Sequence, residues 1–64
     1  MVGQKIRVCR KDAGLNQEQL AEKADLTYKY IGEVERGTVN ISLDSLVRIA
    51  KALKVKVTDL VAGF

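Results

Sequence analysis

Side chains able to recognise nucleic acid crowd one short stretch of this chain, residues 27–36. Lys29 can donate to O6 or N7 of guanine, Glu33 can accept from N4 of cytosine, and the Tyr28 ring can contact a thymine methyl group. The apolar Ile31 and Val34 are spaced to face the opposite side of a helix. The stretch therefore predicts a helix that enters the major groove of DNA. Its candidate base contacts are Thr27, Tyr28, Lys29, Gly32 and Glu33.

Gly32 is unexpected inside such a helix, because glycine there costs about 1 kcal/mol relative to alanine. A functional explanation is close approach of the helix backbone to DNA. A structural explanation is relief of crowding beside Tyr28. The sequence does not separate these two explanations.

Residues 16–37 predict the element that presents this helix: a short helix, a tight turn and a second helix. Asn16 and Thr27 are placed to cap the two helices, and Gln19 gives the first one capping-box spacing. Asp25 would occupy a left-handed conformation in the turn, at a cost of order 1 kcal/mol. The apolar positions fall where two crossing helices touch; they are Leu20, Ala21, Ala24, Leu26, Ile31 and Val34.

Three further helices are predicted around this motif. The first ends near Asp12 with Gly14 as its stop, and its apolar face is Val2, Ile6, Cys9 and Ala13. Another follows a Ser42 cap, with an apolar face of Leu43, Leu46, Val47, Ile49, Ala50 and Leu53. A short last helix begins at Thr58 and Asp59. We therefore expect an all-α, compact five-helix fold, in one domain spanning residues 1–64.

Composition excludes several other functions. The 64 residues contain no histidine and a single cysteine, Cys9, which falls at a core spacing. We therefore expect no metal site, no cofactor and no enzymatic activity. No apolar run approaches the ~18 residues that span a bilayer, and no signal peptide is visible, so a cytoplasmic protein without a membrane partner is expected.

The net charge of +3 is only mildly basic, and the placement of the basic residues is more informative. Lys5, Arg7, Arg10 and Lys11 crowd the first helix, and Lys29 and Arg36 lie on the proposed reading helix. Such clustering is typical of phosphate binding. A second run, at residues 48–56, is interpreted as the polar face of a helix.

Taken together, these segments resemble the phage repressor/Cro-like helix-turn-helix family, which has the lambda-repressor-like fold. The resemblance is carried by Ile6-Arg7, Arg10, Gly14-Leu-Asn-Gln-Glu-Gln-Leu-Ala21, Leu26-Thr27, Tyr30-Ile31, Val34-Glu-Arg-Gly37, Ser42-Leu43, Leu46, Ile49-Ala50, Ala52-Leu53 and Leu60. It implies a small bacterial or phage transcriptional regulator, similar to restriction-modification controller proteins. It also implies a homodimer on partly palindromic double-stranded DNA, with half-sites about one turn, ~34 Å, apart. No small-molecule ligand is expected.

The resemblance also implies roles for individual residues. Gln17, in the first turn of its helix, would bind a phosphate together with free backbone N–H groups. Arg10 and Glu35 would form a partly buried ion pair between the first and third helices. The remaining candidate phosphate contacts are Arg10, Asn16, Arg36, Asn40 and Ser42.

Apolar residues beyond the needs of one small core suggest a dimer surface: Val39, Ile41, Val57, Val61 and Phe64. The alternative for Phe64 is that it folds back on its own domain. The family often has proline at the position of Ile41, so a less rigid loop with an exposed Ile41 is expected. A rival function is an antitoxin or other protein-interaction module whose main partner is a protein.

Overall fold

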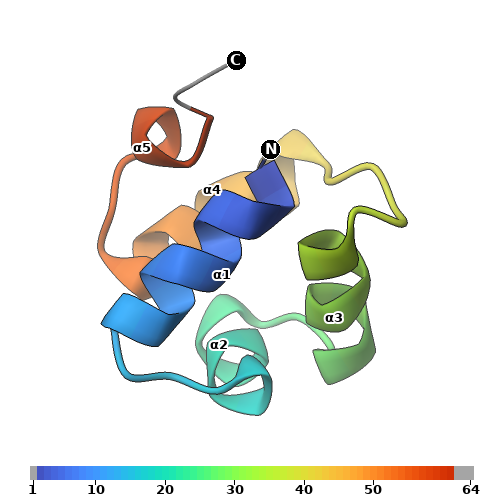
Figure 1. The fold of residues 1–64 in the computed structure, drawn as a ribbon, viewed down its shortest axis with the longest axis horizontal. Coiled ribbons are helices and arrows are strands. Elements are labelled where there is room, and N and C mark those ends of the chain that lie inside the picture. The colour runs from blue at the N-terminus through green and yellow to red at the C-terminus, as the bar shows by residue number, and fades with distance from the viewer. Residues whose placement is uncertain (1, 62–64) are drawn as a thin grey trace.

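Side-chain caps set most of the helix starts in the computed structural model, which describes residues 2–61. The five helices in this range are α1 (Val2–Asp12), α2 (Gln17–Ala24), α3 (Tyr28–Arg36), α4 (Leu43–Leu53) and α5 (Val57–Val61) (Figure 1). Oxygens of Asn16, Thr27 and Ser42 accept backbone N–H bonds at the starts of α2, α3 and α4. The predicted all-α, five-helix fold is confirmed, and no strand occurs in this part of the chain.

One residue from each helix is fully buried, and these five side chains define the centre of the core. They are Ile6, Leu20, Ile31, Ile49 and Leu60. Burying a side chain of this size contributes about 1.5–3 kcal/mol. α2 packs against α3 and α4, and α1 packs against α3 and α5, so every helix is held by at least one neighbour. α3 and α5 lie at opposite sides of the molecule (Figure 1).

Several predictions about burial need correction, among them that of Val47, which is only half-buried on α4. Ala13 is exposed because α1 ends at Asp12 and the chain turns away at Gly14, whose φ is 74°. Leu43 is 72% exposed because it lies at the edge of the apolar face of α4, whose buried residues include Leu46, Ile49 and Leu53. Cys9 and Leu26 are only half-buried against the core.

Two helix ends differ from the expected pattern. Lys54 ends α4 with a φ of 58°, a left-handed conformation that glycine or asparagine adopts more readily. α5 begins at Val57, one residue earlier than predicted. Its start is fixed by the Asp59 carboxylate, which accepts the backbone N–H of Lys56 at 3.0 Å.

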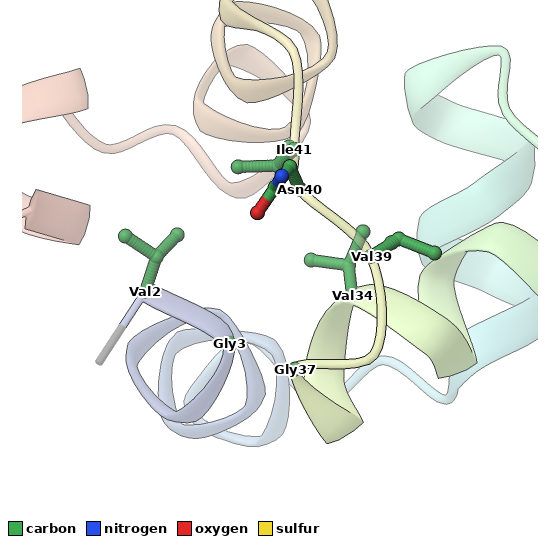
Figure 2. A pocket seen from close by; sticks show the side chains of 7 residues that line it. All are labelled: Val2, Gly3, Val34, Gly37, Val39, Asn40 and Ile41. Carbon is green, nitrogen blue, oxygen red and sulfur yellow. The ribbon is translucent and has the colours of Figure 1, made fainter.

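Gly3 allows α1 and α3 to approach each other closely. Figure 2 shows Val2 and Gly3 at the start of α1, facing Val34 and Gly37 at the end of α3, with loop residues 39–41 around the same hollow of about 220 Å³. A methyl group on Gly3 would collide with the carbonyl oxygen of Val34 and lie 3.0 Å from that of Glu35. Both obstacles are backbone atoms and cannot rotate aside.

Gly3→Ala is therefore expected to lower the free energy of unfolding by about 1–3 kcal/mol, the usual cost of overpacking. The gain in helix propensity offsets only part of this loss. Urea unfolding followed by circular dichroism measures the change. Gln4→Ala is the control, because Gln4 is exposed on the same helix. Equal stability of the two variants would contradict the close contact.

No helix in residues 2–61 has the length and apolar character needed to cross a bilayer. Across the same residues, no group of three or more potential metal-binding side chains comes together.

Candidate nucleic-acid interface

α3 is anchored by its apolar side and exposes the polar one. Ile31 and Val34 are buried at 0% and 3% exposure, as predicted. Tyr28 is 56% exposed, Thr27 and Lys29 are also exposed, and Glu33 is half-buried. The first turn of α3 therefore projects outward from a rigid support, with hydrogen-bonding side chains at its surface.

The turn before α3 is built as the sequence predicts. Asp25 has a φ of 57°, and the backbone N–H of Leu26 donates to the Ala21 carbonyl at 2.8 Å. Thr27 Oγ1 then accepts the N–H of Tyr30 at 3.1 Å. At the other end of α3, Gly37 stops the helix with a φ of 76°. These local bonds fix the angle between α2 and α3.

A buried ion pair joins α1 to α3. Arg10 donates from Nε to Glu35 Oε2 at 2.7 Å and from Nη2 to Glu35 Oε1 at 3.1 Å. Its remaining terminal nitrogen, Nη1, donates to the Leu15 carbonyl at 2.9 Å. The two side chains are only 10% and 4% exposed. The structure thus contains the pair that the family resemblance implied, in a bidentate geometry.

This geometry argues against the second role expected for Arg10. All three guanidinium nitrogens already donate inside the protein, and the residue is 8% exposed. Two of the five guanidinium N–H groups have no partner among these bonds, but the burial of Arg10 leaves them little access to a phosphate. Arg10 is therefore placed as an internal support of α3 and not as a phosphate ligand.

Gln17 extends the same network to the start of α2, a contact that the sequence analysis missed. Its Nε2 donates to Glu35 Oε1 at 3.1 Å. Glu35 therefore holds both Arg10 and Gln17. One amide hydrogen and the carbonyl oxygen of Gln17 are left for other partners. No local signal in the sequence marks this bond, because the two residues are 18 positions apart.

Gly32 is buried, although the sequence analysis placed it on the exposed face of α3. The cause is Arg36: a methyl group built on Gly32 would lie 3.2 Å from Arg36 Nη1 and 3.9 Å from its Cζ. The exposed Arg36 side chain thus lies back along α3 and covers the glycine. The neighbour that crowds Gly32 is Arg36, and not Tyr28 as the structural explanation supposed.

The remaining phosphate candidates lie at helix starts and in the loop after α3. Asn16 is exposed, but its Oδ1 accepts the N–H of Gln19 at 2.8 Å as a cap. Asn40 is exposed in the loop. The Ser42 hydroxyl accepts from the N–H of Ser45 at 3.1 Å and donates to Ser45 Oγ at 2.9 Å. Ser42 has no free hydroxyl hydrogen to donate, so its side chain does not favour a phosphate contact.

The basic run at residues 48–56 is a solvated helix face only in part: Arg48 and Lys51 lie on α4, whereas Lys54 and Lys56 follow its end. Arg48 is paired with Asp44 at 3.0 Å and with Asp25 at 3.5 Å, while Lys51 is exposed. These pairs neutralise part of the positive charge on that side.

The expected dimer surface is less exposed than predicted. Val39, Ile41, Val57 and Val61 are half-buried and pack against the core. The loop that carries Ile41 is folded onto the ends of α1 and α3, which accounts for its partial burial (Figure 2). Phe64, the last residue of this predicted surface, lies outside the described residues.

The fold and this site are those of a helix-turn-helix protein, and comparison with known proteins gives the same result. The model of the helix-turn-helix family matches residues 6–60. The chain is 46% identical over 61 residues to control protein C.BamHI of Bacillus amyloliquefaciens, covering 94% of this chain and 75% of that one. It is 45% identical over 60 residues to the immunity repressor protein of Bacillus phage phi105, covering 94% and 42%.

A solved structure agrees with these relatives. The crystal structure of SinR in complex with DNA has a TM-score of 0.91 and 35% identity, covering 95% of this chain and 98% of that one; SinR is a Bacillus subtilis protein. The chain therefore belongs to the helix-turn-helix family. The three proteins are named as a control protein, a repressor and a regulator, and none of them is named as an enzyme.

Proposed function

We propose that this protein is a sequence-specific transcriptional regulator that binds double-stranded DNA through α3 and represses by occupying its operator. The observation that carries the proposal is the presentation of α3. Its inner side is held against the rest of the protein by the buried Ile31 and Val34 and by the Glu35 ion pair. Tyr28 and Lys29 are exposed in its first turn. Since the proposed partner is DNA, the protein is placed in the cytoplasm of its cell.

Base and phosphate contacts are divided by position. Thr27, Tyr28, Lys29 and Glu33 are proposed to meet base edges, because they surround the exposed first turn of α3 or follow it on the outward side. Gln17, Asn16 and Asn40 are proposed to position the protein on the phosphate backbone. Gln17 is the best-placed of these, because it is the first residue of α2, where backbone N–H groups lack helical partners, and its side chain is oriented by the bond to Glu35.

The protein is proposed to act as a homodimer. Ile41, Val57 and Val61 are apolar and only partly buried against the core, and their remaining exposed area is proposed to be covered by a second copy. A two-fold dimer would place its two α3 helices in successive turns of the major groove, about 34 Å apart. Sedimentation equilibrium across a concentration series measures the association of the protein with itself. A protein that stays monomeric both with and without DNA would contradict the proposed dimer.

Selection of binding sites from random double-stranded DNA tests the function. An inverted repeat with half-sites near one helical turn apart is the expected result. Weak, salt-sensitive binding without any motif would contradict sequence-specific regulation and favour a module whose partner is a protein.

Lys29→Ala is expected to relax the preference at one base pair by about 1–3 kcal/mol, because it removes a donor to a base edge. Affinity measurements on operators that differ at single positions show the change. Gln17→Ala is the comparison: it should weaken binding to all operators alike and reduce the salt dependence. If Lys29→Ala behaved like Gln17→Ala, Lys29 would be a phosphate contact.

A further inference from the structure

We infer that Arg36 reads a guanine base in the major groove and that Gly32 exists to place its guanidinium on the reading face of α3. This inference rests on the proposed function. It replaces the phosphate role that the sequence suggested for Arg36 and the direct base contact that it suggested for Gly32.

The first observation is the direction of the Arg36 side chain. Arg36 is the last residue of α3, but its guanidinium lies over Gly32, one turn closer to the start of the helix. Helical side chains point toward the N-terminus, so this direction is unstrained. The positive charge is thereby moved away from the end of the helix and toward the residues proposed to read bases.

The second observation is the surface that the guanidinium joins. A shallow hollow of about 190 Å³ is lined by Gln17, Tyr28, Lys29, Gly32 and Arg36. Lys29, Gly32 and Arg36 follow one another at three- and four-residue steps, so they share one face of α3. The two cations therefore border the same hollow, which Tyr28 also lines.

The third observation is that the Arg36 donors are free. Arg10 and Arg48 are both paired with carboxylates, whereas the Arg36 side chain forms neither an ion pair nor a hydrogen bond with any other residue between 2 and 61. Its rigid fork of N–H groups matches O6 and N7 of guanine in a bidentate contact. A lysine in the same place would supply the charge but not the fork.

Gly32 is the positioning residue in this arrangement. A methyl group 3.2 Å from Nη1 is tighter than ordinary van der Waals contact, so the guanidinium would have to move by a few tenths of an ångström. Because the obstacle is the end of a flexible side chain, the fold tolerates the substitution. Gly32→Ala should therefore keep or raise stability while displacing the guanidinium.

Site selection followed by affinity measurements at several salt concentrations tests the inference. The proteins compared are wild type, Arg36→Lys, Arg36→Ala and Gly32→Ala, each checked for folding by circular dichroism. Arg36→Ala and Arg36→Lys should lose the preference for guanine at one position of each half-site, by about 5- to 150-fold. Gly32→Ala should weaken the preference at that same position, and Lys29→Ala should act at a different one.

Arg48→Ala is the matched control, because it removes one positive charge from a residue outside α3. The inference is overturned if Arg36→Ala keeps the wild-type motif and weakens all operators equally, with a salt slope smaller by about one phosphate contact. It is also overturned if Gly32→Ala leaves the guanine preference unchanged. If wild type selects no motif at all, the proposed function fails, which is a separate and recognisable result.

Discussion

Replacing Glu35 with glutamine is expected to lower the free energy of unfolding by about 3–5 kcal/mol, because it leaves the Arg10 charge buried without its counter-charge. Glu35 is the centre of the network: its two carboxylate oxygens accept from Arg10 and from Gln17. A glutamine side chain has a single acceptor oxygen, so at least one of these three bonds is lost.

The loss of stability in Glu35→Gln should be large enough that a substantial fraction of the protein molecules is unfolded at about 37 °C. For a domain of 60–100 residues, 1 kcal/mol shifts Tm by about 4–8 °C. A 64-residue chain buries about 60% of the surface that it exposes when unfolded, a smaller fraction than in larger domains, so its stability is modest. Thermal and urea unfolding followed by circular dichroism measure the loss.

A double-mutant cycle isolates the ion pair from other effects. Arg10→Met and Glu35→Leu should each be strongly destabilising, while the double variant should recover part of the loss because no charge remains buried. Glu22→Gln serves as the control, since Glu22 is exposed on α2. If Glu35→Gln unfolds at the same urea concentration as Glu22→Gln, the pair does not support the fold.

Leu60→Ala should lower the free energy of unfolding by about 2–5 kcal/mol, the range for truncating a buried leucine. Leu60 is 0% exposed and is the buried residue of α5. A five-residue helix has no stability of its own in water, so α5 depends on this side chain for its place. Removing it should release α5 from α1 and α4, the helices that hold it.

The same variant connects stability with assembly. Val57 and Val61 flank Leu60 on α5 and belong to the proposed dimer surface. Sedimentation equilibrium should therefore show weaker association for Leu60→Ala under conditions where it is still folded. Leu60→Met, which conserves volume, should cost less than about 1.5 kcal/mol and keep the dimer. If Leu60→Ala and Leu60→Met were equally stable, the side chain would not be the anchor of α5.

The ends of the helices were predictable because their signals are local. Asn16, Thr27 and Ser42 each cap a helix by bonding to the residue three positions ahead, and Gly14 and Gly37 stop helices through their own conformation. The apolar spacing was also informative: all five fully buried side chains stand at positions that the pattern placed in helices. The left-handed conformation of Lys54 at the end of α4 was not predicted, because a lysine residue gives no indication of a positive φ.

The sequence alone determined the helix order, the turn at Asp25 and the outward position of Tyr28 and Lys29, because each depends on residues only a few positions apart. Tertiary structure decided which polar residues are available at the surface. Arg10 and Gln17 both bond to Glu35 across 25 and 18 positions, and Leu43 is exposed because no other helix covers the edge on which it lies. Such contacts depend on how helices cross, which side-chain packing sets and local spacing does not. The order and ends of the helices thus followed from short-range interactions. That Arg10 is a buried support whereas Arg36 is a surface residue could be seen only once the helices were packed together.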